Sequence, residues 1–217
     1  MRIVIAGGHG KVALLLSEIL ATAGHEPVGL IRNPAHAAEV KATGATPLVL
    51  DLESSDVASV AFALAGANAV VFAAGAGAGS GPERKQTVDR DGAILLADAA
   101  DAAGVLRFVV ISSIGADGFA TAGDDMGAYL KAKSEADAYI RESALDWTIV
   151  RPGPLTDEEP TGLVTVGDDS LERGEISRAD VARVVAIAID EPATLRQQFV
   201  VVGGAVAVSD ALKSLVR

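Results

Sequence analysis

The amino-acid sequence predicts a single α/β domain built on a doubly wound, mainly parallel sheet, and three observations lead to this fold class. The chain has 217 residues, 50% of them hydrophobic, which suffices for one α/β core and is short for two. Short apolar runs alternate with segments whose apolar residues have helical spacing. The first apolar run passes directly into a glycine cluster. We therefore expect one domain over residues 1–217 with βαβ alternation.

The predicted strands are short runs rich in β-branched residues. In chain order they read RIVIA, PVGLI, TPLVL, AVVFAA, RFVVIS, WTIV and FVVV. Parallel strands are covered by helices on both faces, so they are apolar along their whole length rather than at alternate positions. The carboxyl ends of such strands form one edge of the sheet, and ligands of doubly wound proteins bind beyond that edge.

The predicted helices lie between these strands, at residues 12–23, 57–65, 92–103, 130–143 and 181–189, where apolar residues recur every three or four positions. Right-handed crossovers place such helices on both faces of the sheet. The least regular stretch begins at residue 152. We expect residues 152–177 to form a small segment that covers the substrate.

Composition excludes several classes of site and partner. A formal net charge of −11 disfavours binding to nucleic acid or to an anionic membrane surface. The absence of cysteine excludes a disulfide, a thiolate metal site and a cysteine nucleophile. The three histidines are scattered, so no metal site is expected.

Targeting and membrane segments are not expected either. No apolar run approaches the ~20 residues that a transmembrane helix needs. The opening run MRIVIAGG breaks at glycine before it reaches the length of a signal-peptide core. These features favour a cytoplasmic protein.

The strongest motif is the glycine cluster between the first strand and the first helix. Glycine permits a tight turn and close approach of a pyrophosphate, and the helix amino terminus offers N–H groups and partial positive charge. Ala13 occupies the position of close helix-to-strand packing. The order of strand, turn and helix favours a Rossmann-type dinucleotide site over a turn without a ligand. The expected cofactor contacts are Gly7, Gly8, His9, Gly10, Lys11 and Val12.

Arg32 follows the second strand, about twenty residues after the glycine cluster, where NAD-preferring proteins place an acidic residue. A guanidinium there can pair with a ribose 2′-phosphate. We therefore expect NADP(H) to be preferred over NAD(H). The alternative is a surface arginine without a ligand.

Two further strand ends face the same crevice. Asp51 and Leu52 follow the third strand, and the small residues Ala73, Ala74 and Gly75 follow the fourth and leave room for a cofactor. Contact of Asp51 with adenine and capping of a helix that starts near Ser54 are both open interpretations.

A candidate catalytic group follows the fifth strand. Ser112 and Ser113 end that strand, and Tyr129 and Lys133 are four residues apart, on one face of a predicted helix. A phenol with a pKa near ~10 is a poor acid or base at neutral pH, but a neighbouring ammonium favours the phenolate. A serine hydroxyl can polarise a substrate carbonyl. Tyrosine and lysine at this spacing also occur by chance, so other support is needed.

That support comes from a family resemblance that covers nearly the whole chain. Besides the glycine turn, it rests on VDRDGA at 88–93, ISSIGA at 111–116, YLKAK at 129–133, WTIVRPGPL at 147–155 and ISRADVA at 176–182. With these motifs the chain resembles the short-chain dehydrogenase/reductase superfamily. Within it, the chain is similar to the small atypical group with an NmrA-like NAD(P)-binding domain.

The resemblance implies roles for individual residues. Tyr129 would be the catalytic acid/base, Lys133 would bind the nicotinamide ribose and favour the phenolate, and Ser112 or Ser113 would orient the substrate. The segment Arg151 to Gly153 would lie close to the nicotinamide. The cofactor contacts implied at this end are Ile111, Lys133, Pro152, Gly153 and Leu155.

Asp89 departs from the family pattern, because it stands where many members of the superfamily have an asparagine that positions the lysine through water. The usual proton relay is therefore in question.

Three functions remain in competition. The first is an NADPH-dependent oxidoreductase that reduces a small carbonyl, quinone or flavin-like acceptor with Tyr129 as proton donor. The second passes hydride to a stacked flavin or biliverdin-like acceptor without the tyrosine. The third is a non-catalytic NADP(H)-binding redox sensor of NmrA-like type. A sugar-nucleotide epimerase is disfavoured because little chain follows Pro152, and a monomer or homodimer is expected.

Overall fold

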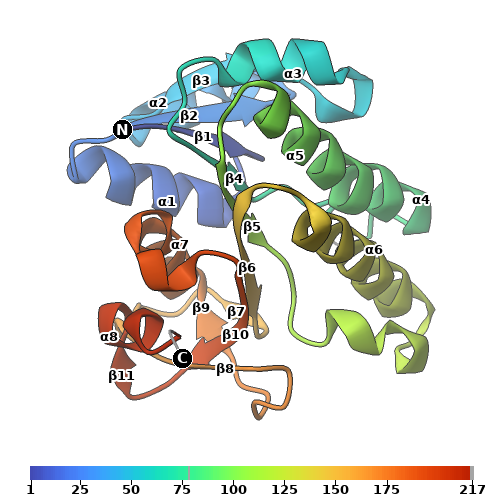
Figure 1. Ribbon diagram of the computed structural model, residues 1–217, viewed down its shortest axis with the longest axis vertical. Coiled ribbons are helices and arrows are strands. Elements are labelled where there is room, and N and C mark those ends of the chain that lie inside the picture. Colours follow the sequence, from blue (N-terminus) through green and yellow to red (C-terminus); the bar gives the residue numbers. More distant parts are fainter. Residues whose placement is uncertain (78, 216–217) are drawn as a thin grey trace.

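A computed structural model of the chain describes residues 1–77 and 79–215 and shows a doubly wound α/β fold (Figure 1). Within this part of the chain the main sheet has nine strands in the order β11-β8-β10-β6-β5-β4-β1-β2-β3. The strands that run parallel are β1 (Arg2–Ala6), β2 (Glu26–Ile31), β3 (Thr46–Val49), β4 (Ala69–Phe72), β5 (Arg107–Ile111), β6 (Asp146–Pro152) and β10 (Gln197–Gly203). The order reverses beside β1, so the edge beyond β1 and β4 is the topological switch point where ligands of such sheets bind.

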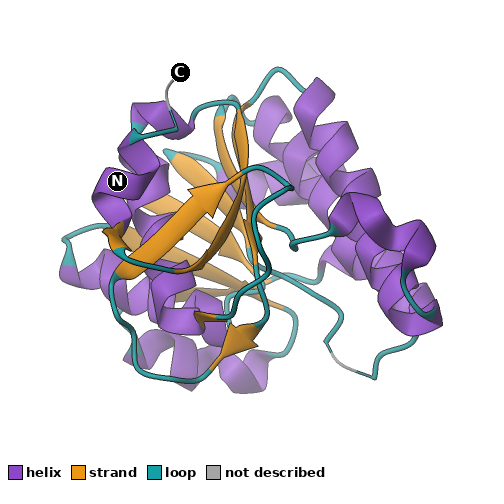
Figure 2. Cartoon of the chain, turned by 90° about the horizontal axis from the view of Figure 1, so that it is seen from below, coloured by secondary structure: helices purple, strands orange, loops and turns teal. Residues whose placement is uncertain are grey.

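Helices cover both faces of the sheet, as Figure 2 shows from below. One face carries α1 (Lys11–Thr22), α7 (Arg178–Asp190) and α8 (Val208–Lys213). The other carries α3 (Val57–Leu64), α5 (Gly92–Ala102) and α6 (Asp124–Glu142). Successive residues of β1 serve opposite faces: Ile3 and Ile5 pack under α1, whereas Val4 packs under α5. This alternation buries β1 completely and fixes its carboxyl end at the switch point.

Each strand and helix predicted from the sequence is present, with shifted ends in some cases. The predicted helix at 130–143 begins earlier, at Asp124, so Tyr129 lies within the second turn of α6 rather than at its start. The alternation of strands and helices therefore predicts the sheet and its covering layers correctly.

Several short elements were not anticipated. They are η1 (Pro34–His36), α2 (Ala37–Ala42), the π-helix η3 (Lys85–Asp91), η4 (Ala116–Thr121), η5 (Pro192–Thr194), β11 (Val206–Ala207) and α8. The short helix expected near Ser54 is η2 (Leu52–Ser54), and α4 (Pro82–Arg84) forms a further helical turn. The segment 152–177, read as irregular, contains β7 (Leu155–Thr156), β8 (Leu163–Gly167) and β9 (Ile176–Ser177). β8 pairs antiparallel with β10 and extends the sheet, while β7 and β9 form a separate two-stranded ribbon. Whether the segment covers a substrate stays a prediction.

Candidate functional site

The glycine turn after β1 is packed so closely that side chains cannot replace its hydrogens. Gly7 has φ +76°, and a Cβ on it would lie 2.6 Å from the Cα of Ala74. A Cβ on Gly8 would lie 2.6 Å from the Cα of Gly29 in β2. The turn therefore rests directly on the backbones of β2 and of the loop after β4. Ala13 is fully buried, as its small side chain requires.

Gly10 is the N-cap of α1 and brings no side chain to cap it. Its N–H donates to the carbonyl of Gly7 at 2.8 Å, which closes the turn. The first N–H groups of α1 consequently point out of the turn together with the positive end of a 12-residue helix. This arrangement suits a phosphate group.

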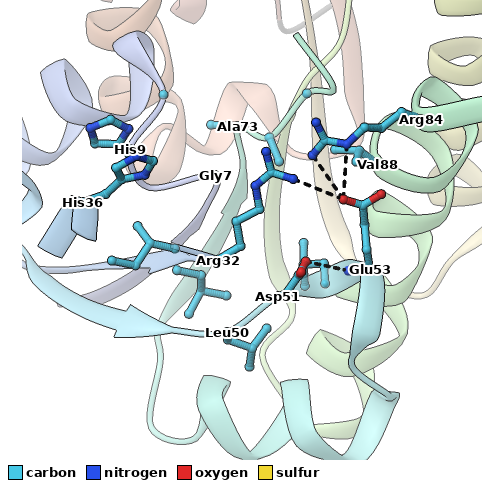
Figure 3. A pocket seen from close by; sticks show the side chains of 16 residues that line it. Gly7, His9, Arg32, His36, Leu50, Asp51, Glu53, Ala73, Arg84 and Val88 are labelled. Atoms are coloured by element: carbon cyan, nitrogen blue, oxygen red, sulfur yellow. Dashed lines mark hydrogen bonds and ion pairs between the residues drawn. The ribbon is translucent and has the colours of Figure 1, made fainter. Parts of the chain in front are cut away.

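A cavity of about 280 Å³ opens beside the turn, at the carboxyl ends of β1, β2, β3 and β4 (Figure 3). It brings together these residues expected from the sequence: Gly7, His9, Gly10, Arg32, Asp51, Leu52, Ala73, Ala74 and Gly75. Gly8 lies beneath the turn, whereas Val12 packs against the core and Lys11 is exposed. The cavity thus corresponds to the predicted nucleotide site.

Two arginines meet one carboxylate at the rim of this cavity (Figure 3). Glu53 accepts from Arg84 at 3.1 Å and from Arg32 at 3.5 Å, and its other oxygen accepts from the hydroxyl of Thr87 at 2.6 Å. The Thr87 hydrogen bond lowers the pKa of Glu53, and the two guanidinium groups lower it further. Glu53 therefore holds both arginines at the position predicted for a 2′-phosphate.

Glu53 was missed by the sequence reasoning, and so was its contact with Arg84. No local pattern joins these two residues, because they are far apart in the chain. The available signal was that Glu53 stands two residues after Asp51, at a strand end that faces the crevice.

His9 contributes its ring, as well as its backbone, to the cavity. The ring stacks on that of His36 with centroids 3.7 Å apart, and its Nε2 lies 3.0 Å from Glu39. Both imidazoles line the cavity on the side of β2 (Figure 3). His36 was not anticipated, because its element η1 was not.

Asp51 caps a short helix, as one of its two interpretations expects, and its contact with adenine stays a prediction. Its side chain accepts from the N–H of Glu53 at 3.1 Å and so caps η2, while the residue also lines the cavity. The cap fixes the backbone that presents Glu53 to Arg32 and Arg84.

Lys133 is buried behind Tyr129 at the carboxyl end of β5. Its Nζ donates to the carbonyl of Ile111 at 3.2 Å and lies 3.2 Å from Oδ1 of Asp89 and 5.8 Å from the centroid of the Tyr129 ring. Burial by itself lowers the pKa of Lys133, but Tyr129 and Asp89 outweigh it and raise that pKa. The lysine is therefore a fixed cation beside the phenol.

The two serines have different surroundings. Ser112 is buried and donates to Asp137 at 2.7 Å, whereas Ser113 is partly exposed and its hydroxyl reaches only the carbonyl of Ile114 at 3.3 Å. The hydroxyl of Ser112 is thus committed to the protein interior. Ser113 is the serine whose hydroxyl is free to turn toward a substrate.

The side chain of Arg151 points into the protein interior. Its guanidinium is fully buried and donates to Asp137 at 2.9 Å, to Asp117 at 2.8 Å and to Asp169 at 2.9 Å. Burial alone would lower the pKa of Arg151, but the bond to Asp117 and the charge of Asp137 raise it instead. The side chain therefore binds α6, η4 and the loop after β8 together, and the closeness of this segment to a nicotinamide stays a prediction.

The rest of this strand end is tightly packed backbone. Pro152 and Gly153 are buried, and a Cβ on Gly153 would lie 1.9 Å from the carbonyl oxygen of Gly174. Leu155 follows in β7, partly buried against the core under α7. Ile111 offers its carbonyl to Lys133. The predicted contacts of these four residues with a cofactor stay predictions.

A bridge of exposed charges joins the glycine turn to the segment after β7. Lys11 donates to Asp157 at 2.6 Å, and Arg178 at the start of α7 donates to the other oxygen of the same carboxylate at 2.7 Å. The hydrogen bond from Lys11 lowers the pKa of Asp157, and Arg178 adds to this effect. Lys11, expected on the phosphates, is therefore engaged by an internal anion.

Comparison with known proteins identifies the family. The model of a family described as NAD(P)H-binding matches residues 7–192, from the glycine turn to the end of α7. The chain belongs to this NAD(P)H-binding family.

Relatives of similar length agree with that membership. An uncharacterized sugar epimerase of Bacillus subtilis, YhfK, is 34% identical over 99% of this chain and 100% of its own. A solved structure from Bacillus halodurans, provisionally named NAD-dependent epimerase/dehydratase, is 38% identical with a TM-score of 0.93 over 99% of both chains. The oxidoreductase ylbE of Lactococcus lactis is 29% identical with a TM-score of 0.88 over 99% of this chain and 96% of that one. The resemblance to short-chain dehydrogenase/reductase-type Rossmann proteins is confirmed.

The site fits the dinucleotide for which this NAD(P)H-binding family is named. Gly7 and Gly8 bring the turn so close to the neighbouring backbones that no side chain would fit there. The first N–H groups of α1 have no side-chain cap, and the guanidinium of Arg32 can bind an anion. Among residues 1–77 and 79–215, no histidine and carboxylate side chains gather in a group suited to a metal ion. No helix in the same ranges combines the length and apolar character needed to cross a membrane.

Proposed function

We propose that this NAD(P)H-binding protein is an NADPH-dependent reductase of a small carbonyl, quinone or flavin-like acceptor. The observation that carries the proposal is the arrangement of Tyr129 and Lys133. The ammonium is buried 5.8 Å from the phenol ring and is anchored to the end of β5, on the sheet edge that carries the glycine turn. A proton donor therefore stands beside the edge where a nicotinamide is expected.

A bound nicotinamide would supply the hydride, and the side chains of this chain would handle the proton. The Tyr129 hydroxyl donates its proton to the acceptor oxygen as the hydride reaches carbon. Lys133 stabilises the negative charge left on the phenol, and its burial prevents water from screening that effect. The Ser113 hydroxyl, which has no strong internal acceptor, turns to hold the acceptor oxygen.

The preference for NADP(H) is supported by the two arginines around Glu53. In a site for NAD(H), an acidic residue would accept from the ribose hydroxyl groups. Here the carboxylate is satisfied by Arg84 and by the hydroxyl of Thr87, while Arg32 extends over the cavity with a half-exposed side chain. A 2′-phosphate would take over one or both guanidinium groups and bring two negative charges where the carboxylate brings one.

The first experiment measures NADPH oxidation against aldehydes, ketones, quinones and flavins, and separately measures the interconversion of nucleotide sugars, because epimerisation returns the hydride and consumes no NADPH. Nucleotide sugars are included because two relatives are named as epimerases. Tyr129→Phe is compared with Tyr139→Phe, which alters the only other tyrosine, an exposed residue bonded to Asp98. We expect Tyr129→Phe to lower turnover by about a hundredfold or more with cofactor affinity nearly unchanged, and Tyr139→Phe to have no effect. Equal turnover in the two variants rejects Tyr129 as the acid and favours direct hydride transfer to a stacked acceptor.

A redox sensor is the second candidate, and one observation favours it. The cationic groups expected to hold the cofactor are paired with internal anions: Arg32 with Glu53, and Lys11 with Asp157. Cofactor binding must break these contacts, so it would change the exposed surface around the segment after β7. Affinities for NADPH and NADP+ that differ by tenfold or more, without turnover of any acceptor, would support this candidate. For either function we expect a cytoplasmic protein, monomeric or homodimeric in sedimentation experiments.

A further inference from the structure

A buried carboxylate lies on the far side of the catalytic lysine. Asp89 belongs to the π-helix η3, which leads into α5, and it is 1% exposed. Its Oδ2 accepts the N–H of Ala76 at 3.0 Å, and its Oδ1 lies 3.2 Å from Nζ of Lys133. Asp89 therefore joins the loop after β4 to the lysine that faces Tyr129. The widened π-helical turn sets the side chain in this position, and such turns are frequent at functional sites.

The charges around Lys133 come from three directions. Tyr129 lies on its own helix, Asp89 faces it from η3, and Asp137 faces it from one turn further along α6. Asp137 is already engaged by Arg151 and Ser112, at 2.9 Å and 2.7 Å. Among the described residues, Lys133 is the one cation within ion-pair distance of Asp89. Asp89 and Lys133 are thus each other's counter-ions.

We propose that Asp89 is a positioning residue that pairs with Lys133, weakens the pull of the ammonium on the Tyr129 phenol, and so biases the site toward proton donation and reduction. This inference rests on the proposed function of Tyr129 as the acid. A lone ammonium beside a phenol favours the phenolate, whereas an ammonium already paired with a buried carboxylate does so much less. The site therefore differs from one in which a neutral side chain holds the lysine.

Reduction and oxidation need different protonation states of Tyr129 at the start of the reaction. In reduction the O–H bond of Tyr129 breaks as the O–H bond of the product forms, and the phenolate then recovers a proton from water. In oxidation the phenolate must exist beforehand in order to accept the proton of an alcohol. An Asp89–Lys133 pair disfavours that starting state, so reduction continues to higher pH and oxidation begins only at higher pH.

The direct test follows the ionisation of Tyr129 by its ultraviolet phenolate absorbance. In a Tyr139→Phe background Tyr129 is the only tyrosine, so the signal has one source and requires no substrate. Asp89→Asn preserves shape and an oxygen for the Ala76 N–H while removing the charge. We expect the midpoint of the phenolate titration to fall by about one pH unit or more. An unchanged or higher midpoint overturns the proposal.

Asp91→Asn is the matched control. Asp91 lies on the same helix, but it is exposed and pairs with Arg90 at 2.7 Å, so its neutralisation should leave the midpoint unchanged. An equal shift in Asp91→Asn would mean that general charge, and not the contact with Lys133, moves the phenol. If Asp89→Asn does not fold, the Tyr139→Phe protein with Asp89 intact is titrated by itself. A phenolate that forms near neutral pH in that protein contradicts the inference.

The pH–rate profile then separates the inference from the function on which it rests. The rate of reduction is measured against pH with whichever acceptor oxidises NADPH in the first experiment. In Asp89→Asn, the pH above which this rate declines should fall by as much as the midpoint of the phenolate titration falls. If the midpoint moves but turnover does not depend on Tyr129, the charge argument holds and the proposed function fails. If turnover depends on Tyr129 but Asp89→Asn shifts neither the phenolate midpoint nor the alkaline decline of the rate, only the role of Asp89 is rejected.

Discussion

The two halves of the ligand-binding edge hold their charges in different ways. At the nucleotide half, beyond β1 to β4, the side chain of Lys11 is 68% exposed and that of Arg32 is 54% exposed, while Arg84 beside Arg32 is 31% exposed. At the catalytic half, beyond β5 and β6, the cations are buried, with Lys133 at 4% and Arg151 at 0%. Exposed pairs are weak and exchangeable, whereas buried pairs are expensive to break.

This difference indicates a division of labour within one sheet edge. A dinucleotide phosphate can displace Glu53 from Arg32 or Asp157 from Lys11 at little cost, because water and salt already compete for those pairs. No ligand can displace Asp89 from Lys133 as easily, so the buried pair fixes geometry and protonation before a substrate arrives. At the nucleotide half a ligand can replace the internal partner of a cation, whereas at the proposed catalytic half the buried ion pairs stay intact when a ligand binds.

The largest expected effect compares one arginine from each half. Arg151→Met should reduce the free energy of unfolding by about 3–5 kcal/mol, because Asp137 would stay buried without its cation. Arg178→Met removes a partner of the exposed Asp157 and should cause a change too small to resolve beside it. Denaturant unfolding measures both.

A second substitution tests whether the unpaired charge of Asp137 causes the loss of stability in Arg151→Met. Asp137→Asn added to Arg151→Met removes the orphaned charge and should recover part of the lost stability, since the amide can still accept from Ser112. Equal losses in Arg151→Met and Arg178→Met would contradict the contrast between the two halves.

A smaller effect is expected on cofactor choice. If Arg84, which now donates to Glu53, binds the 2′-phosphate as proposed, Arg84→Gln should weaken NADP+ binding by about ten- to hundredfold and leave NAD+ binding unchanged. Glu53→Gln should act in the opposite direction and raise affinity for NADP+, since the internal competitor is weakened. Isothermal titration with both cofactors measures the ratio.

Arg90→Gln serves as the control for Arg84→Gln, because Arg90 pairs with Asp91 and Glu135 and does not line the cavity. A loss of NADP+ affinity in Arg90→Gln equal to that in Arg84→Gln would indicate a general charge effect. A loss shared by NAD+ and NADP+ would place Arg84 away from the 2′-phosphate.

The sequence predicted what short-range patterns determine. The glycine turn, its helix and the cavity-lining strand ends follow from residues adjacent in the chain, and Tyr129 and Lys133 share a face because both lie on α6. The antiparallel β8 was missed because LVTVG is a short run between glycines, and its partner β10 is far along the chain. Strand pairing of this kind depends on tertiary contacts.

The interior direction of Arg151 could not be read from its motif. Its partners Asp117, Asp137 and Asp169 lie in η4, α6 and the loop after β8, so the cluster exists only once these segments meet. The same holds for the commitment of Ser112 to Asp137. A sequence motif indicates where a strand ends. The direction in which each of its side chains points depends on partners from other elements of the fold.

The smallest expected effect concerns acid stability, and Asp117 is the residue that reports it. Asp117 accepts from Arg151 at 2.8 Å and from Ser134 at 2.7 Å, and the bond from Arg151 is the main cause that lowers the pKa of Asp117. A carboxyl whose pKa is lower in the folded protein stabilises it above the unfolded pKa of about 3.9, and this contribution is lost as pH falls through the folded pKa. The unfolded chain binds the proton more readily, so acid favours unfolding.

Asp117→Asn should therefore cost up to about 1 kcal/mol of unfolding free energy near pH 6, because the Asp117 side chain is half exposed, and the difference from wild type should shrink as the pH falls through the folded pKa of Asp117. Asp157→Asn, also a carboxyl of lowered pKa, should give no resolvable change in physiological salt, since its partner Lys11 lies in water. Urea unfolding over that pH range measures both variants. If Asp157→Asn cost as much as Asp117→Asn, the burial of the cationic partner would not be what distinguishes the two halves.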